Sequence, residues 1–262
     1  MPEGPQCRQY ADLLAKRVSG RSLVDIRVLG GRYQDKPPSG LPSFKTQLPV
    51  EIVGAGVHGK FLYWILKDEF SLWNTLGMTG NWSSNITKYS RAEFILSDGS
   101  IFFNDMRNFG TLKFVRGKFQ LLEKLKSLGP DMLATDIDNK LFIRRMRFCD
   151  NLQITEALLN QSVIAGVGNY IKSDSLWLSR INPHRHVKDI QDIELEDLNR
   201  AIKQVMREGY DHVKTISLET ERHEYNVKYL VYNQKSDPDG NEVVRELTSD
   251  QRTTHWCPIV QK

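Results

Sequence analysis

The first residues of the chain, Met1-Pro2-Glu3, could carry covalent chemistry. If Met1 is removed, Pro2 becomes an N-terminal secondary amine, and an α-amino group titrates near pH ~7.7–8.0, far below a lysine. Part of such an amine is unprotonated at neutral pH, so it can attack a carbonyl-type carbon and form an iminium. The Glu3 carboxyl could then move the protons that this chemistry requires. A flexible chain start is the alternative interpretation of the same residues.

A second motif, Ala165-Gly166-Val167-Gly168-Asn169-Tyr170, lies between two stretches with helical spacing. Glycines there let a ligand approach the main chain closely. The N–H groups at the start of the following helix favour an anion, and Asn169 adds a side-chain amide donor. These residues predict a phosphate contact, with an ordinary glycine-containing turn as the alternative.

The elements that must position these motifs fall into two halves. Residues 6–18 have helical spacing, and Gly20 ends the helix. From Ser22 to about Arg116, short strands are separated by Gly, Pro, Asp and Asn turns, which favours an antiparallel sandwich or barrel. The expected strands include 23–29, 61–66, 69–76, 92–96 and 101–104, with a hairpin turn at Ser97-Asp98-Gly99-Ser100.

The second half is mainly helical after a linker at about 129–135. Helices are predicted over 153–161, 169–180 and 193–208. A capping box at Thr135-Asp136-Ile137-Asp138 opens another helix, with Ile137, Leu141 and Phe148 inward and Arg144, Arg145 and Arg147 largely outward. Near the end, a turn at 237–241 precedes a strand at 253–256.

Composition sets broad limits on the protein class. The 262 residues are 40% hydrophobic and carry a net charge of +4, a weak tilt toward polyanionic partners. The sequence contains no apolar run of membrane-spanning length and no secretory signal, so we expect an intracellular protein. Its three cysteines, Cys7, Cys149 and Cys257, form neither a CxxC pair nor a disulfide framework.

Met1-Pro2-Glu3-Gly4-Pro5, together with Gln161-Ser162-Val163-Ile164 and the glycine motif that follows it, resembles the Fpg/Nei family of DNA glycosylases over nearly the whole chain. The opening looks more like the endonuclease VIII (Nei) branch. The resemblance implies an α+β multidomain fold. An N-terminal antiparallel β-sandwich with a leading helix covers 1–130, a helix–two-turn–helix domain covers 135–228, and a β-hairpin finger covers 229–262.

The resemblance also implies roles for single residues. Lys60, in Gly59-Lys60-Phe61-Leu62, corresponds to a hairpin lysine that positions and protonates the lesion site. Met78, Arg107 and Phe109 correspond to residues that fill the helix where the damaged base has left, although Met78 and Phe109 would otherwise read as core residues. Asn108 stands where many relatives have an arginine. Arg144, Arg145 and Arg147 could meet the DNA backbone, with a solvated helical face as the alternative. The implied catalytic residues are Pro2, Glu3, Lys60 and Arg252, and the implied DNA-binding residues are Met78, Arg107, Phe109, Gly168, Asn169 and Asp174, the last replacing a glutamate of relatives.

The finger of the family normally supplies two CxxC pairs, the four thiolates of a structural zinc site. Here Cys257 is present, but its partner position is Val260, and the first pair falls at about Asp239 and Glu242. We therefore expect a zincless finger, a β-hairpin held by packing alone, with no metal and no cofactor. Arg252 at its tip would contact phosphate, which suits a planar, permanently charged fork.

The implied function is that of a bifunctional DNA glycosylase/AP lyase of base excision repair, acting as a monomer on damaged duplex, single-stranded or bubble DNA, with no membrane partner. Oxidised pyrimidines are the favoured substrates and hydantoins are further candidates. The segment 217–225 replaces a longer lesion-capping loop of Fpg-type members, which weakens the case for 8-oxoguanine. A lesion-binding protein without catalysis and an N-terminal-proline tautomerase are the alternatives.

Overall fold

The computed structural model describes residues 2–212, 216–219 and 227–262. The chain forms two compact units. The first, here the sandwich unit, comprises residues 1–2, 6–127 and 213–225. The second, here the helical unit, comprises residues 3–5, 128–212 and 226–262.

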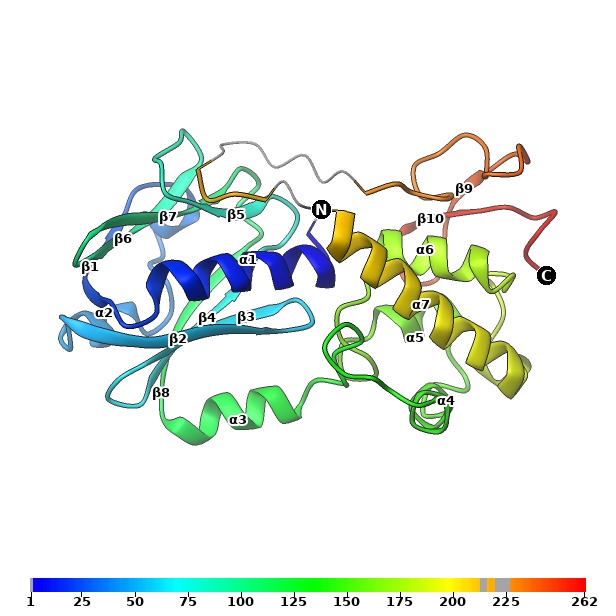
Figure 1. Ribbon diagram of the computed structural model, residues 1–262, viewed down its shortest axis with the longest axis horizontal. Coiled ribbons are helices and arrows are strands. Elements are labelled where there is room, and N and C mark those ends of the chain that lie inside the picture. Colours follow the sequence, from blue (N-terminus) through cyan, green and yellow to red (C-terminus); the bar gives the residue numbers. More distant parts are fainter. Residues whose placement is uncertain (1, 213–215, 220–226) are drawn as a thin grey trace. The chain divides into compact units, whose positions relative to one another are not determined.

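The sandwich unit is built on antiparallel strands in the order β5-β7-β6-β1-β2-β3-β4-β8 (Figure 1). Strands β1 and β2 are paired only through Ser22↔Glu51 and Leu23↔Val50, so the sheet separates there into two four-stranded layers. The predicted antiparallel β-sandwich is therefore confirmed. Its strands are β1 (Ser22–Val28), β2 (Val50–His58), β3 (Phe61–Leu66), β4 (Phe70–Thr75), β5 (Gly80–Ser83), β6 (Ser90–Leu96), β7 (Gly99–Asp105) and β8 (Thr111–Arg116).

Aromatic side chains fill the core of the sandwich unit. Trp64 and Trp82 lie with ring centroids 5.2 Å apart, and Phe94 contacts both. The buried indole of Trp82 donates a hydrogen bond to Asn74 Oδ1 at 3.0 Å, which satisfies its N–H group. On β6, buried residues alternate with partly exposed ones, as expected for a strand with one face on the core.

Helix α1 (Gly4–Val18) matches the predicted helix at residues 6–18, and it begins in the helical unit and continues in the sandwich unit. Helices α2 (Leu41–Lys45) and α3 (Lys118–Lys126) were not predicted from the sequence. Both are short, and α3 buries none of its side chains, so it leaves little periodic signal.

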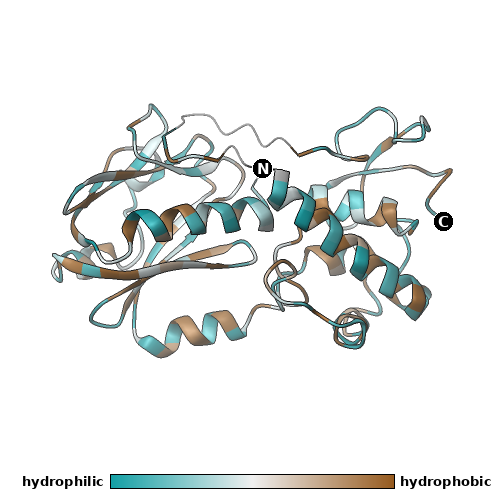
Figure 2. Cartoon of the chain, viewed as in Figure 1, coloured by the Kyte–Doolittle hydropathy of each residue, from teal (hydrophilic) through white to brown (hydrophobic). Residues whose placement is uncertain are grey.

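The helical unit contains α4 (Asn139–Arg147), α5 (Ile154–Leu159), α6 (Asn169–Leu178), α7 (Asp192–His212) and the hairpin of β9 (Val244–Leu247) and β10 (Thr253–Trp256). Hydrophobic and hydrophilic residues alternate along α7, as its amphipathic sequence requires (Figure 2). Among the described residues, no helix is long and apolar enough to cross a membrane.

Two details of α4 differ from the prediction. The cap is Asp138, whose Oδ1 accepts the N–H group of Leu141 at 2.7 Å, so the helix begins later than the expected capping box. Phe148 was expected inward but is 77% exposed, because Phe142 and Met146, four residues apart, occupy the buried face.

Candidate active site

Glu3 is anchored at the N-terminus of α6. Its side chain is 1% exposed, and its carboxylate accepts the N–H groups of Tyr170 at 2.9 Å and Ile171 at 3.3 Å. The positive end of a helix dipole favours a carboxylate at this position. The N–H group of Gly4 adds a bond to the carbonyl of Gly166 at 2.9 Å. The start of the chain is therefore fastened to the glycine motif by both side chain and backbone.

Gly168 makes room for this arrangement. A Cβ atom at Gly168 would lie 2.3 Å from the carboxyl carbon of Glu3, closer than any real contact allows. The sequence predicts an anion at the start of α6. For the amides of Tyr170 and Ile171, that anion is the Glu3 carboxylate and not a phosphate. The pairing of Glu3 with Gly168 was not predicted, because residues so distant in sequence meet only in the fold.

Pro2 and Lys60 both belong to the sandwich unit. Pro2 is buried, and its peptide bond to Glu3 fixes it within one residue of the anchored carboxylate. Lys60 is half-buried in the two-residue turn between β2 and β3, where His58 pairs with Phe61. Gly59 has a φ of +57°, the sign that a type II′ turn requires at its first central residue.

The structure brings together the residues predicted to fill the DNA helix. Arg107 Nη1 lies 3.2 Å from the sulfur of Met78. Phe109 is 58% exposed, and the loop that carries it passes so close to Gly77 that a Cβ there would lie 2.8 Å from the Phe109 carbonyl carbon. Three residues from two loops therefore share one part of the sandwich unit, and Phe109 is a surface residue rather than a core one.

Asp105, which was not predicted as a site residue, holds these two loops in place. One carboxylate oxygen accepts the hydroxyl of Thr79 and the N–H group of Arg107, and the other accepts the N–H group of Gly110 at 2.6 Å. The position of an aspartate at the end of a strand, just before a loop, was the available signal, because aspartate commonly bonds backbone N–H groups that follow it.

The finger residues do not fit a zinc ion. Cys257 is completely buried, whereas Asp239 and Glu242 are exposed. In the described part of the chain, no group of three or more His, Cys, Asp or Glu side chains could hold a metal ion. Arg252 is exposed in the turn between β9 and β10, the predicted tip of the hairpin.

The expectation that packing alone holds this hairpin is wrong. Lys172 of α6 forms a buried ion pair with Asp250 in the hairpin turn, and it also donates to Thr254 Oγ1 at 2.8 Å. The Asn169 side-chain amide donates to the Thr253 carbonyl at 2.8 Å. Polar contacts from α6 therefore fasten the hairpin, and at least one N–H of the predicted phosphate ligand Asn169 serves this purpose.

The surroundings of Asp174 disfavour the DNA-binding role that the sequence resemblance implied for it. It is 2% exposed, and its oxygens accept the backbone N–H groups of Leu230, Val231 and Tyr232 at 2.8–3.1 Å. Burial disfavours the charged form and raises the pKa of Asp174 to about 6, against the opposing effect of these hydrogen bonds. The residue therefore supports the segment after α7.

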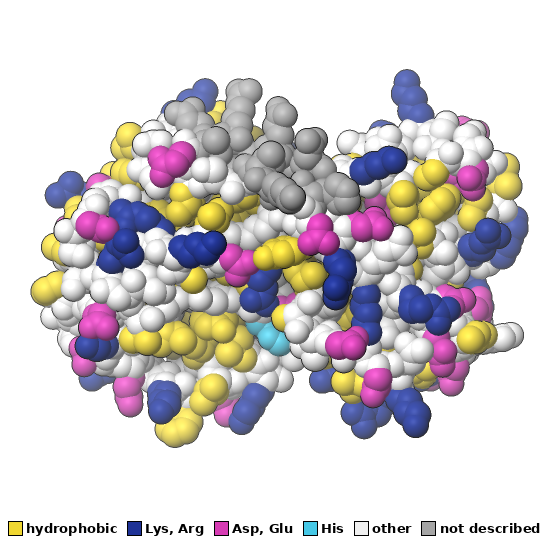
Figure 3. Space-filling view, viewed as in Figure 1, with side chains coloured by type: hydrophobic (Ala, Val, Ile, Leu, Met, Phe, Trp, Pro, Cys, Tyr) yellow, Lys and Arg dark blue, Asp and Glu magenta, His cyan; other side chains and the backbone are white. Residues whose placement is uncertain are grey.

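The three arginines of α4 differ from one another. Arg144 is exposed, and Arg145 Nη1 lies 3.4 Å from the carbonyl of Ser162. Arg147, which was expected outward, donates to the carbonyls of Val187 at 2.7 Å and Ile190 at 2.8 Å, so it serves the fold. Basic and acidic side chains are interspersed on the face of the helical unit in Figure 3, so charge alone singles out no DNA-binding residue there.

Residues 220–225 of the predicted lesion-loop segment 217–225 lie outside the described residues. The carbonyl of Leu218 accepts the Ser84 N–H group at 2.6 Å.

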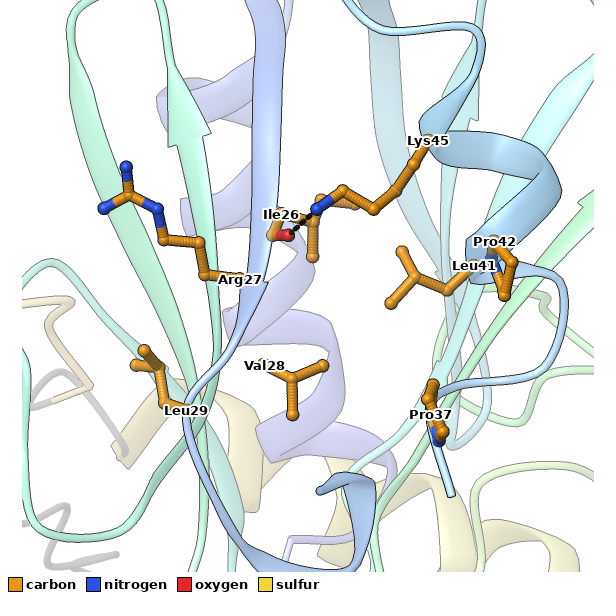
Figure 4. A pocket seen from close by; sticks show the side chains of 8 residues that line it. All are labelled: Ile26, Arg27, Val28, Leu29, Pro37, Leu41, Pro42 and Lys45. Atoms are coloured by element: carbon orange, nitrogen blue, oxygen red, sulfur yellow. Dashed lines mark hydrogen bonds between the residues drawn. The ribbon is translucent and has the colours of Figure 1, made fainter. Parts of the chain in front are cut away.

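A separate pocket in the sandwich unit contains none of the predicted site residues (Figure 4). Lys45 Nζ donates there to the carbonyl of Ile26 at 2.9 Å, beside the apolar side chains of Val28 and Leu41.

Comparisons with known proteins cover the whole chain. The formamidopyrimidine-DNA glycosylase N-terminal domain matches residues 1–112, the H2TH domain of the same glycosylase matches 128–220, and its C-terminal domain matches 218–262. The formamidopyrimidine-DNA glycosylase of Thermus thermophilus is 30% identical over 100% of this chain and 98% of its own. That of Halalkalibacterium halodurans is 28% identical over 100% of both.

Solved structures give the same result. The Lactococcus lactis Fpg (MutM) protein in complex with DNA containing an oxidised pyrimidine superposes with a TM-score of 0.87 at 25% identity, over 100% of both chains. A mutant of the same protein in complex with DNA containing Fapy-dG superposes with a TM-score of 0.86, also at 25% identity over 100% of both chains.

Proposed function

The chain belongs to the formamidopyrimidine-DNA glycosylase (Fpg) family of base-excision-repair enzymes, and on this premise we propose that it removes oxidised bases from DNA and then cleaves the strand as an AP lyase. The observation that carries the proposal is the anchorage of Glu3 on the first turn of α6. It holds a carboxylate at a fixed place one residue from Pro2. A flexible chain start, the alternative interpretation of these residues, does not account for it.

The proposed reaction begins once Met1 has been removed. The Pro2 nitrogen bonds to C1′ of the damaged nucleotide, and the base leaves with the electron pair of its bond to C1′. Glu3 assists protonation and opening of the sugar ring, which leaves an iminium between Pro2 and C1′. The iminium acidifies the 2′ hydrogen, so successive β- and δ-elimination expel the phosphates on both sides.

The remaining residues would bind and orient the DNA. Lys60 positions the lesion site, and Arg252 engages a phosphate and supports the second elimination. Met78 and Phe109 occupy the space left by the extruded base, and Arg107 hydrogen-bonds the orphaned partner base. The contact between Arg107 and Met78, and the exposure of Phe109, support this assignment.

We propose oxidised pyrimidines as the favoured substrates, with hydantoins next. The Nei-like opening Met1-Pro2-Glu3-Gly4-Pro5 supports this choice, as does the complex of the L. lactis relative with DNA containing an oxidised pyrimidine. The names of the relatives make formamidopyrimidines the competing class. The domain limits 1–130, 135–228 and 229–262 and the monomeric state belong to the same proposal.

A panel of matched duplexes tests the function. Each duplex carries one oxidised pyrimidine, hydantoin, formamidopyrimidine, 8-oxoguanine or abasic site. We expect base release from the first class to be fastest, and strand ends bearing phosphate on both sides of the gap. Tight binding without base release would instead indicate a lesion-binding protein. Turnover of small keto acids without any action on DNA would indicate a tautomerase.

A further inference from the structure

Lys172 is a completely buried lysine, a rare state for this residue unless its charge is paired. Its partner is Asp250, whose side chain is only 3% exposed. Burial lowers the pKa of Lys172, whereas the hydrogen bond from its ammonium group to Asp250 raises it. The two charges therefore depend on each other inside the helical unit.

Asp250 in turn organises the loop that leads to Arg252. Its Oδ1 accepts the Thr248 hydroxyl at 2.6 Å and the backbone N–H group of Arg252 at 3.1 Å, while Oδ2 accepts Lys172. The Thr248 N–H group also bonds to the Arg252 carbonyl at 3.1 Å. One carboxylate thus links α6 directly to the backbone of Arg252.

The same turn of α6 carries the contact to Glu3. Lys172 lies two residues after Tyr170, whose N–H group binds the Glu3 carboxylate. If the hairpin moved relative to α6, a buried charge would lose its partner, and an unpaired buried charge is strongly unfavourable. The ion pair therefore selects one placement of the hairpin turn relative to the helix that anchors Glu3.

We propose that Lys172 is a positioning residue for Arg252. Its ion pair with Asp250 fixes the turn Thr248–Arg252 on α6, and this sets where the Arg252 guanidinium meets the DNA backbone. The inference rests on the proposed function, because it assigns Lys172 to the elimination step that Arg252 supports. It also explains how a hairpin without zinc ligands can hold Arg252 at a fixed position.

The informative variant is Lys172→Met combined with Asp250→Asn. Lys172→Met alone leaves the Asp250 carboxylate buried and unpaired, so it could unfold the hairpin. The double variant removes both charges, and the amide that replaces the carboxylate keeps an oxygen for the Thr248 hydroxyl and the Arg252 N–H group. Lys203→Met is the matched control, because Lys203 also pairs with an aspartate, Asp136, but one that is 97% exposed.

On abasic-site DNA, the double variant should lower the yield of δ-elimination product by about tenfold relative to β-elimination product, as Arg252→Ala should. Borohydride trapping and the first strand cut should stay near wild-type levels in the double variant. Adding Arg252→Ala to the double variant should change the product ratio no further. An unchanged product ratio in a folded double variant overturns the proposal. A loss of borohydride trapping as large as the loss of δ-elimination product overturns it too.

Amide hydrogen exchange gives a readout that needs no activity. The Arg252 amide should exchange about tenfold faster in the double variant than in the wild type or Lys203→Met, because its turn loses the buried ion pair that holds it on α6. Unchanged protection overturns the inference whatever the enzyme does. A wild-type protein that cuts no abasic site would instead defeat the proposed function and leave the exchange result to decide the role of Lys172.

Discussion

The Oε1 atom of Glu3 lies 2.9 Å from the backbone nitrogen of Tyr170, although the two residues are 167 positions apart along the chain. This bond, and the absence of a side chain at Gly168, fix the Glu3 carboxylate on α6, one residue along the chain from the proposed nucleophile Pro2. The chemistry assigned to the start of the chain therefore depends on a glycine in its second half.

Gly168→Ala should displace Glu3, because the new Cβ would meet the carboxyl carbon at 2.3 Å. We expect about a 100-fold loss of abasic-site cleavage, the effect that a misplacement of about 1 Å can have. Single-turnover kinetics measure the loss. Gly54→Ala is the control, since its nearest neighbour would be Ser19 Oγ at 3.8 Å, and its activity should be unchanged. Equal activity of the two variants would contradict the assigned role of Gly168.

Phe109→Ala should weaken binding to a duplex with an abasic-site analogue by about tenfold or more, because an apolar wedge is lost from the stack. Its stability should change by less than about 0.5 kcal/mol, because the ring is 58% exposed. Phe119→Ala on α3, where the ring is 76% exposed, is the matched control and should bind normally. Equilibrium titration distinguishes them, and similar affinities would remove Phe109 from the DNA-binding surface.

Asp174 should make stability depend on pH in an unusual direction. Its pKa is raised from 3.8 to about 6, so the folded state holds the proton more tightly than the unfolded state does. The stability that this group contributes is therefore lost as the pH rises from about 4 to about 6. Asp174→Asn should gain stability relative to the wild type across this range and level off above it. Urea unfolding of both proteins at several pH values checks this. A difference in their free energies of unfolding that does not change with pH would contradict it.

Arg147→Ala should destabilise the protein by about 1–3 kcal/mol, because the carbonyls of the buried residues Val187 and Ile190 would lose their hydrogen-bond donor. Arg144→Ala, on the same helix but exposed, should leave the free energy of unfolding nearly unchanged. Denaturant unfolding of both variants checks the contrast. A similar small effect for both would place Arg147 on a solvated face instead.

Much of the fold followed from local patterns. Strand β3 and strand β10 fall at the predicted residues, because hydrophobic alternation and turn residues mark them clearly. Helices α2 and α3 were missed, since a short helix, or one that buries none of its side chains, carries little periodicity. Phe148 was misplaced because Phe142 and Met146 occupy the buried face of α4, and Phe148 directly follows that helix and is exposed.

The candidate site was predictable where motifs carry it and not where distant residues meet. Pro2, Glu3 and Asn169 stand in recognisable motifs. The residues that support them do not belong to a motif. Asp105 binds a backbone N–H group of the loop that follows it, and Lys172 and Asp250 lie 78 positions apart in the sequence. Only the folded chain shows that these ordinary charged residues are buried and paired.

Borohydride trapping tests Pro2 as the nucleophile most directly. Hydride reduces the iminium between Pro2 and C1′ to a stable amine, so protein incubated with abasic-site DNA and borohydride should yield a covalent adduct. Peptide mapping should place the adduct at the Pro2 nitrogen, and protein whose N-terminal nitrogen has been acetylated should lose it, because that nitrogen is then no longer nucleophilic. No adduct from the folded wild-type protein, or an adduct mapped to a lysine, would contradict this mechanism.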